Sequence, residues 1–254
     1  MERKSLIPFS PDGSLPASFG EVVPSGFWKR ITFNWQLKVF QVGKKEDGNI
    51  QREITFEPIF RYSGIKRNFE NDYVEGSEDK PTCYSLDGKT GSQPQITRVL
   101  ADGQEWPVYG ECKSCKFNEW RSRGLWKPPG GMTNTKAKQC AQYTLMLVMY
   151  NNEVCMIQIP STGVESVNES IQLVVTAKDK KFEEVRWQLV GTGGGFQGKY
   201  MKVNPMGWLT EDEITELNSH RAQCYAQFEK SVISFAKGGA DEEEKEVAGG
   251  VVNA

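Results

Sequence analysis

Four cysteines are the residues of this chain whose type and spacing best suit chemistry. Cys112 and Cys115 form a CxxC pair, Cys83 precedes the pair, and Cys140 follows it. A CxxC turn lets two thiolates bind one tetrahedral metal ion, and two thiolates from distant parts of a sequence complete such a site. The pattern therefore predicts a structural zinc site, because four thiolates leave no open coordination position for catalysis.

Two further cysteines have the surroundings of core residues. Cys155 lies in the apolar run 154–159, and Cys224 lies in a stretch with helical periodicity. A buried free cysteine behaves as a small hydrophobic residue. We therefore predict that both are packing residues. Six cysteines without a signal peptide are better explained as metal ligands and core residues than as disulfides.

Positive charge and tryptophan gather around the CxxC pair. Between Lys113 and Lys138 the only acidic residue is Glu119, and Trp120 and Trp126 lie in the same stretch. The basic residues of this stretch are Lys113, Lys116, Arg121, Arg123, Lys127, Lys136 and Lys138. Cations bind phosphates and aromatic rings stack on exposed bases, so this composition suits a single-stranded nucleic acid.

A second basic and aromatic cluster comprises Arg61, Tyr62, Lys66, Arg67 and Phe69, and it is equally consistent with a solvated surface. Taking both clusters together, we predict that basic residues meet phosphates and that aromatic residues stack on bases. The phosphate candidates are Arg121, Arg123, Lys127, Arg61, Lys66 and Arg67, and the stacking candidates are Trp120, Trp126 and Tyr62.

Motifs that resemble catalytic sites are weaker. The run 87–90 contains Gly-Lys-Thr but lacks the glycine that a phosphate-binding loop needs at position 83. Asp102, Glu111 and Lys113 have the order found in metal-dependent nucleases, but the CxxC pair overlaps them. His220 is the only histidine, which argues against a histidine triad or a zinc–water enzyme. We therefore expect no catalytic activity, and a nuclease is the least favoured alternative.

The elements that must position these residues are mostly strands. Residues 31–39 alternate between apolar and polar side chains, and residues 54–62 form a second strand interrupted by Pro58. These two segments predict a long antiparallel hairpin with Pro58 at an edge or a bulge. The apolar runs 143–150 and 154–159 predict two more strands, joined by a turn at the asparagine pair between them.

The last part of the chain predicts a glycine-rich hairpin and two helices. Residues 185–190 and 197–203 flank the glycines of the hairpin, and a first helix begins near Ser161. The sequence Thr210-Glu211-Asp212-Glu213 is a capping box for a helix that continues to about residue 236. Three tryptophans outside the basic stretch, Trp35, Trp187 and Trp208, are predicted to be packing residues.

These elements predict a mainly β fold with helices, as an antiparallel barrel or sandwich with a closing C-terminal helix. We expect an irregular N-terminal arm over 1–30, one domain over 31–237 with a zinc-bearing insertion at about 63–140, and a disordered acidic tail over 238–254. The tail is either a solubilising end or a polyanion that competes with nucleic acid or recruits replication or recombination proteins. No apolar run reaches membrane-spanning length, so a cytoplasmic protein is expected.

The same residues resemble a family of phage and mobile-element single-stranded DNA-binding proteins with an OB-like fold and a cysteine-bound zinc insertion. The resemblance rests on Cys83-Tyr84-Ser85-Leu86-Asp87-Gly88, on the CxxC pair followed by Phe117 and Trp120, and on Lys138-Gln139-Cys140 before an apolar strand. It covers about residues 30–236. The chain departs from the family pattern in having Lys116 where a proline is expected, and in ending with VAGGVVNA rather than an apolar tip.

The resemblance implies an OB-like antiparallel barrel with a structural Zn²⁺ in its insertion. It also implies sequence-independent binding of single-stranded DNA during DNA replication or recombination. The main alternative is a structural or scaffold protein of a virion, in which zinc only braces a loop.

Overall fold

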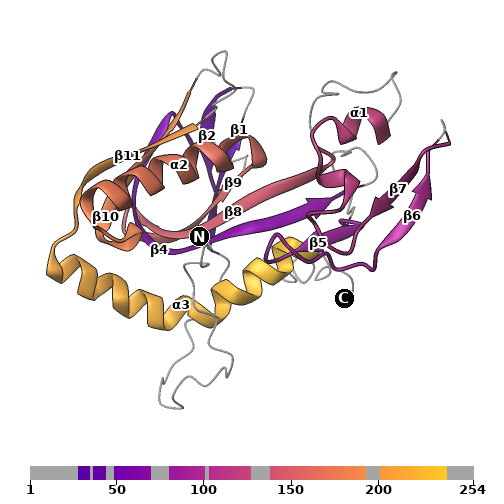
Figure 1. The fold of residues 1–254 in the computed structure, drawn as a ribbon. Coiled ribbons are helices and arrows are strands. Elements are labelled where there is room, and N and C mark those ends of the chain that lie inside the picture. The colour runs from indigo at the N-terminus through magenta and orange to yellow at the C-terminus, as the bar shows by residue number, and fades with distance from the viewer. Residues whose placement is uncertain are drawn as a thin grey trace, which may run out of the picture. The chain divides into compact units, whose positions relative to one another are not determined.

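A computed structural model describes residues 28–34, 37–43, 49–69, 80–100, 103–126, 138–192 and 201–238. The strands are β1 (Lys29–Asn34), β2 (Val39–Val42), β3 (Ile50–Gln51), β4 (Glu53–Asn68), β5 (Cys83–Ser85), β6 (Ile96–Val99), β7 (Glu105–Val108), β8 (Cys140–Tyr150), β9 (Glu153–Ile159), β10 (Val185–Gly191) and β11 (Met201–Trp208). The helices are η2 (Lys116–Asn118), α1 (Ser122–Trp126), α2 (Ser161–Lys178), η3 (Phe182–Glu184) and α3 (Glu211–Lys237). The prediction of a mainly β fold with helices is confirmed (Figure 1).

The chain forms two compact units. The sheet unit comprises the described residues up to Tyr62 and the segment Leu145–Phe228, and the cysteine unit comprises Ser63–Thr144 and the described residues from Glu229 onward. β4, β8 and α3 each contribute residues to both units. All four cysteines of the predicted zinc site belong to the cysteine unit.

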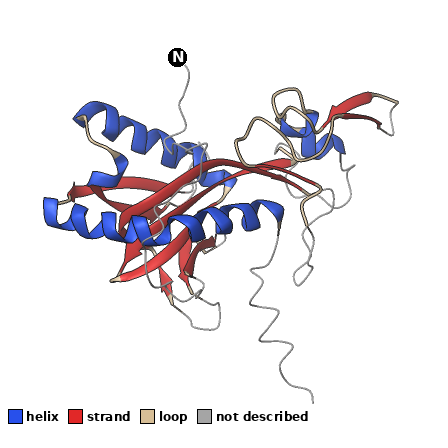
Figure 2. Cartoon of the chain, turned by 90° about the horizontal axis from the view of Figure 1, so that it is seen from below, coloured by secondary structure: helices blue, strands red, loops and turns tan. Residues whose placement is uncertain are grey.

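Most strands belong to one sheet with the order β11-β10-β4-β8-β9-β1-β2-β3. The ladder of β1 and β9 is parallel, whereas those of β10 with β11 and of β10 with β4 are antiparallel. In the sheet unit the strands curl into a half-barrel beside α2 (Figure 1). Figure 2 shows that strands make up much of this unit. In the cysteine unit β5 pairs with the end of β4, while β6 and β7 form a separate hairpin.

The segment predicted as one strand over 31–39 is two strands joined by a turn. β1 begins at Lys29, inside the predicted irregular arm, and ends at Asn34. The Asn34 side chain accepts a hydrogen bond from the Leu37 amide (3.0 Å), and its carbonyl oxygen accepts one from the Lys38 amide (2.7 Å). These local bonds reverse the chain into β2, so Leu37, which lies on the apolar face of the alternating pattern, is 63% exposed. Trp35 lies outside the described residues.

The predicted hairpin between the first two segments is also wrong. β2 pairs with β1 and β3, whereas β4 lies between β10 and β8 and is therefore an interior strand. The β4–β10 ladder ends at the pair Phe56–Trp187, so Pro58, which has no N–H to donate, lies beyond that ladder. The Pro58 carbonyl oxygen instead accepts a hydrogen bond of 3.0 Å from Arg221.

The core of the sheet unit lies between α2 and the curled sheet. The α2 residues Val164, Val167 and Ile171 follow helical spacing and are buried with the apolar side chains of the strands. Ser166 of α2 donates a hydrogen bond of 2.8 Å to the carbonyl oxygen of Met201 in β11. The predicted helix after residue 160 is thus confirmed, because its buried stripe offsets the low helix propensity of its valines.

The predicted C-terminal helix and its capping box are confirmed. The Glu213 carboxylate accepts a hydrogen bond of 2.8 Å from the Thr210 amide, and the Thr210 hydroxyl accepts one of 3.3 Å from the Glu213 amide. In the sheet unit, Phe228 of α3 stacks on Phe60 of β4 with ring centroids 5.4 Å apart. No helix within the described ranges is long and apolar enough to cross a membrane.

The two predicted hairpins are confirmed in type, with shifted ends. Asn151 and Asn152 have φ values of 51° and 62° and join β8 to β9. β11 pairs with β10 as predicted but extends from Met201 to Trp208. Trp187 is fully buried as predicted, whereas Trp208 is 46% exposed, which contradicts its prediction as a packing residue. The predicted tail from residue 239 onward lies outside the described residues.

Candidate metal centre

The four cysteines come from three separate parts of the cysteine unit. Cys83 is the first residue of β5, Cys112 and Cys115 lie in the turn before η2, and Cys140 is the first residue of β8. Cys83, Cys112 and Cys115 are buried, and Cys140 is half-buried. None of the six cysteines is in a disulfide.

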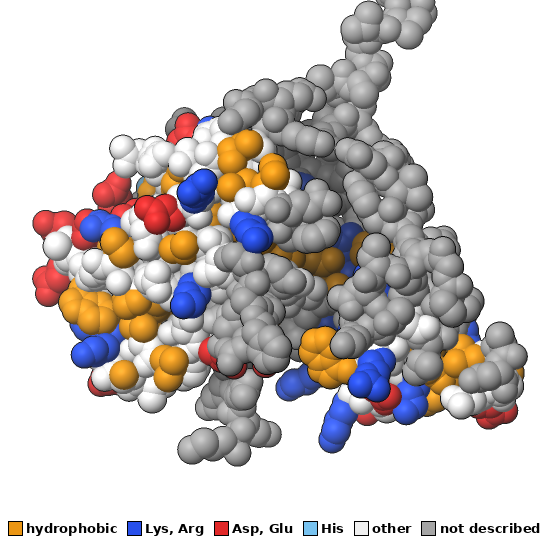
Figure 3. Space-filling view, turned by 90° about the horizontal axis from the view of Figure 1, so that it is seen from above, with side chains coloured by type: hydrophobic (Ala, Val, Ile, Leu, Met, Phe, Trp, Pro, Cys, Tyr) orange, Lys and Arg blue, Asp and Glu red, His pale blue; other side chains and the backbone are white. Residues whose placement is uncertain are grey.

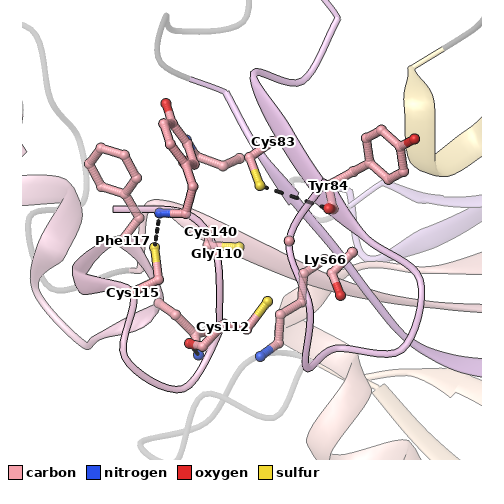
Figure 4. A pocket seen from close by; sticks show the side chains of 13 residues that line it. Lys66, Cys83, Tyr84, Gly110, Cys112, Cys115, Phe117 and Cys140 are labelled. Carbon is pink, nitrogen blue, oxygen red and sulfur yellow. Dashed lines mark hydrogen bonds between the residues drawn. The ribbon is translucent and has the colours of Figure 1, made fainter. Parts of the chain in front are cut away.

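All four side chains line one pocket (Figure 4). The remaining described residues that line it are Lys66, Asn68, Tyr84, Ser85, Gly91, Tyr109, Gly110, Phe117 and Asn118. The structure therefore brings together the cysteines that the sequence spacing grouped.

The thiols are not yet in coordination geometry. Within the described ranges, no three cysteine, histidine, aspartate or glutamate side chains already form a metal-binding group. Their sulfur atoms have other contacts: the Tyr109 amide donates to Cys115 Sγ at 3.2 Å, and Cys83 Sγ lies 3.8 Å from the Tyr84 carbonyl oxygen. Rotation about χ1 changes the position of a sulfur atom without moving the backbone that carries it. The backbone positions of the four cysteines around one pocket therefore persist whichever rotamer each side chain adopts.

The backbone of the CxxC turn is held on both sides. The amides of Ser114 and Cys115 donate to the Glu111 carbonyl oxygen at 3.2 and 3.1 Å. The Cys112 amide donates to the Lys89 carbonyl oxygen at 2.7 Å, which fastens the turn to the segment that follows β5. The Asn118 side chain closes the turn by donating to the Cys112 carbonyl oxygen at 2.8 Å.

Cys140 is tied to the same region through Ser122. The Ser122 hydroxyl, at the start of α1, donates to the Phe117 carbonyl oxygen at 2.9 Å and accepts from the Gln139 amide at 2.9 Å. Phe117 is buried with Trp106 and Tyr109 beside Cys83 and Cys115. This small aromatic cluster is the apolar support of Cys83 and Cys115, and the hydrogen bonds of the turn and of Ser122 act beside it.

A glycine is required beside Cys83. A Cβ atom on Gly91 would lie 3.0 Å from Cys83 Sγ and 3.0 Å from the Gly110 carbonyl oxygen. The Gly91 amide donates to that same carbonyl oxygen at 2.6 Å, so the two backbones cannot separate without breaking the bond. The pocket wall is thus backbone at this point, and no side chain intrudes on the sulfur.

Burial favours the neutral form of two of the thiols, Cys140 and Cys112. Burial raises the pKa of Cys140 to about 12; the neighbouring Cys112 thiol adds to the rise, and the positive charge of Lys66 opposes it. Burial also raises the pKa of Cys112, against a hydrogen bond from Ser85 and the charge of Lys66. Zinc that binds such thiols displaces their protons. The donor set, four sulfurs around one pocket with a cation beside them, fits Zn²⁺.

Trp120 lies on the surface of the cysteine unit. Its side chain is 71% exposed, and the ammonium nitrogen of Lys138 lies 5.3 Å from its ring centroid. Arg121, the next residue, is exposed and has a φ of 68°. The sequence analysis did not predict that Lys138 pairs with Trp120. The only sequence signal for this pairing is the position of Lys138, two residues before Cys140.

Two other candidates from the basic stretch, Arg123 and Trp126, belong to α1. Arg123 lies half-buried in α1. Trp126 is the last residue of α1, but its side chain lies outside the described part of the chain, as does Lys127.

The basic residues of the second cluster each contact a different part of the protein. In the sheet unit, Arg61 donates a hydrogen bond to Asn168 of α2 and lies 5.6 Å from the Phe182 ring centroid, and Tyr62 is half-buried in β4. In the cysteine unit, Arg67 lies against three rings, with distances to the centroids of Phe69, Tyr143 and Phe235 of 4.7, 5.7 and 4.6 Å. Lys66, on the other face of β4, lines the cysteine pocket.

Two of the three residues of the nuclease alternative lie in the described part of the chain. Glu111 and Lys113 are exposed in the CxxC turn, where Glu111 forms a β-bridge with Thr90. Asp102 lies outside the described residues.

No family model, curated protein or solved structure matches this chain.

Proposed function

We propose that this protein binds single-stranded DNA without sequence preference during DNA replication or recombination, and that it has no catalytic activity. The observation that carries the proposal is the Trp120 ring, 71% exposed, with the Lys138 ammonium group 5.3 Å from its centroid. An exposed ring next to a cation offers a base a stacking surface and offers the adjacent phosphate a counter-charge.

The surface around Trp120 supports the same function. Arg121 and Lys113 are exposed, and Lys116 forms a salt bridge of 3.0 Å with Glu119, the acidic residue of this stretch. Figure 3 shows Lys and Arg side chains among hydrophobic, Asp and Glu side chains on the face that it draws. Arg61 and Arg67 have internal partners, so Trp120, Arg121 and Lys138 are the first residues to test.

The metal that we propose is one structural Zn²⁺ held by Cys83, Cys112, Cys115 and Cys140. Zinc in a closed four-thiolate site supplies cross-links between chain segments rather than reactivity. Here it would join β5, the CxxC turn and the start of β8, which the small cluster around Phe117 holds with few apolar contacts. Trp120 follows the CxxC turn after the short helix η2, so the metal would also help to fix the segment that carries the ring.

We also propose that the curled sheet is a variant of the OB-like barrel and that the protein acts in the cytoplasm. OB folds are partly open, strongly curved β-barrels that bind oligonucleotides. The half-barrel around α2 has this curvature, and the antiparallel ladders of β4, β10 and β11 are of the expected kind.

The direct test is titration of the full chain with oligothymidine at low salt, followed by tryptophan fluorescence. We expect quenching, and we expect weaker binding to duplex DNA and to RNA of equal length. The logarithm of the binding constant should fall linearly with the logarithm of the salt concentration, with a slope of about −0.7 for each phosphate neutralised.

Absence of quenching and of any affinity at low salt would overturn the proposal. If the chain instead assembles into particles or filaments without nucleic acid, as light scattering would detect, the scaffold alternative replaces it. Magnesium-dependent cutting of labelled DNA would point to the nuclease alternative.

A further inference from the structure

The strand β4 presents two polar side chains to the cysteine pocket. Lys66 and Asn68 are two residues apart and therefore project from the same face of the strand. In the antiparallel ladder with β5, Asn68 lies opposite Cys83 and Lys66 lies opposite Ser85. Directly opposed side chains are the closest neighbours across a sheet. All four of these residues line the pocket, so the register itself explains why the amide and the ammonium group are there.

Asn68 is buried without a hydrogen-bond partner for its side chain. It is 2% exposed, and among the described residues neither its Nδ2 nor its Oδ1 atom has a partner. Its backbone is satisfied, because its carbonyl oxygen accepts a hydrogen bond of 2.8 Å from the Thr82 amide. Buried side-chain amides almost always have a partner, so an unpaired one in the wall of a thiol pocket needs an acceptor that the thiols themselves can provide.

Lys66 is the cation of this pocket. Among the described residues that line the pocket, Lys66 is the only lysine or arginine. The Lys66 side chain extends from β4 toward the turn that carries Cys112 (Figure 4). Four thiolates around one Zn²⁺ have a net negative charge, which is costly to bury without a counter-charge. The ammonium group of Lys66 lies where that counter-charge is required.

We propose that Asn68 Nδ2 donates a hydrogen bond to a thiolate of the zinc centre, with Cys83 as its cross-strand neighbour, and that Lys66 neutralises part of the charge of the four thiolates. Both residues then determine how tightly zinc is held. This inference rests on the proposed zinc centre. It also moves Lys66 from the predicted phosphate contacts to the metal site, and it adds Asn68, which no sequence motif indicated.

The test measures zinc affinity in the full chain by competition with a chromophoric chelator. The variants are Asn68→Ala, which removes the donor, and Lys66→Met, which removes the charge but keeps an unbranched side chain. Outer hydrogen-bond partners of metal ligands typically change metal affinity by about 10- to 100-fold, and we expect a loss of that size for each variant. Lys66→Arg should restore the affinity, and Lys80→Met, the same change at an exposed lysine of the cysteine unit, should leave it unchanged.

A spectroscopic readout separates the hydrogen bond from a general loss of packing. With Co²⁺ in place of Zn²⁺, Asn68→Ala should shift the thiolate-to-metal charge-transfer band, because a thiolate that loses a hydrogen bond becomes a stronger electron donor. Lys66→Met should keep its affinity for oligothymidine when zinc is saturating, whereas a phosphate contact would lose affinity under that condition.

The outcomes distinguish the two proposals. If the wild-type chain binds no zinc, the metal centre itself is wrong. If the wild-type chain binds zinc and both variants bind it as tightly, with an unshifted cobalt band, the centre stands and the roles of Lys66 and Asn68 are overturned. If Asn68→Ala fails to fold, Asn68→Asp, which keeps the shape of the side chain but has no amide donor, takes its place in both measurements, and an unchanged affinity and cobalt band would overturn the role of Asn68.

Discussion

Lys138 Nζ lies 5.3 Å from the ring centroid of Trp120, so a cation from the segment before β8 covers part of an otherwise exposed indole. Both residues are close in sequence to proposed zinc ligands, Trp120 to Cys115 and Lys138 to Cys140. The proposed zinc would join the two segments that carry this ring and this cation. The proposed stacking surface and the proposed metal centre thus belong to the same cysteine unit.

Trp120→Ala should weaken binding to oligothymidine while leaving the fold intact. Stacking of one base on an aromatic side chain contributes about 1–3 kcal/mol, which corresponds to a loss of about 5- to 150-fold in affinity. The matched control is Trp208→Ala, because Trp208 is also exposed (46%) but belongs to β11 of the sheet unit. Anisotropy of labelled oligothymidine measures both variants, and equal affinities would remove Trp120 from the binding surface.

Cys140→Ser should reduce the bound zinc well below one equivalent per chain and destabilise the cysteine unit. A serine hydroxyl is a poor zinc ligand at neutral pH, so the fourth coordination position is lost. Cys155→Ala is the control, because Cys155 is a fully buried core residue of β9 in the sheet unit. Elemental analysis of the purified variants gives the stoichiometry. A full equivalent of zinc in Cys140→Ser contradicts the ligand assignment.

Gly88→Ala should destabilise the cysteine unit and lower its zinc affinity. Gly88 has a φ of 71°, and a Cβ atom there would lie 2.9 Å from the Gly64 carbonyl oxygen of β4. The left-handed conformation alone costs about 1–2 kcal/mol for a residue with a side chain, and the clash adds to it. Gly103→Ala is the control for the conformational cost without a clash, because Gly103 has a φ of 81° and no atom lies within 4 Å of a Cβ placed there. Thermal unfolding should show the larger loss for Gly88→Ala.

Glu213→Gln should lower stability at neutral pH but not in acid. The hydrogen bond from the Thr210 amide and the one from Arg186 (2.6 Å) hold the pKa of Glu213 below its usual value of 4.5. A carboxyl whose pKa is lowered by folding stabilises the protein above the unfolded pKa, and this contribution disappears as the pH falls through the folded pKa.

The measurement is the difference in free energy of unfolding between wild type and Glu213→Gln from pH 7 to pH 3. We expect about 1 kcal/mol at pH 7, as for other helix caps, and a difference near zero once the carboxyl is protonated. Glu216→Gln, at an exposed position of the same helix, should show little difference at any pH.

Patterns that depend on long apolar runs were predictable from the sequence. β8, β9 and their asparagine turn follow from two such runs, and α3 follows from its capping box and periodicity. The turn after Asn34 was not predictable, because it depends on one side-chain hydrogen bond inside an alternating pattern. Periodicity carries no information about which strands pair, so β4 was assigned the wrong neighbour.

Only part of the candidate site could be predicted from the sequence. Sequence spacing grouped the four cysteines and indicated Trp120 as a surface residue. It assigned Lys66 and Arg67 to one basic cluster, since it could not show that β4 continues to Asn68 and turns these neighbours to opposite faces. Lys66 then meets the thiols, whereas Arg67 meets three aromatic rings.

The position of Cys140 at the first residue of β8 has a consequence for synthesis of the chain. A polypeptide that ends between residues 115 and 140 contains only three of the four proposed ligands. Zinc bound by three protein ligands keeps an open coordination position, which is the arrangement of reactive rather than structural sites. Translation of one further residue supplies the last thiolate and begins the strand β8. Chains truncated between Cys115 and Cys140 would therefore hold the proposed zinc weakly, as we expect for Cys140→Ser, and would lack its cross-link to β8.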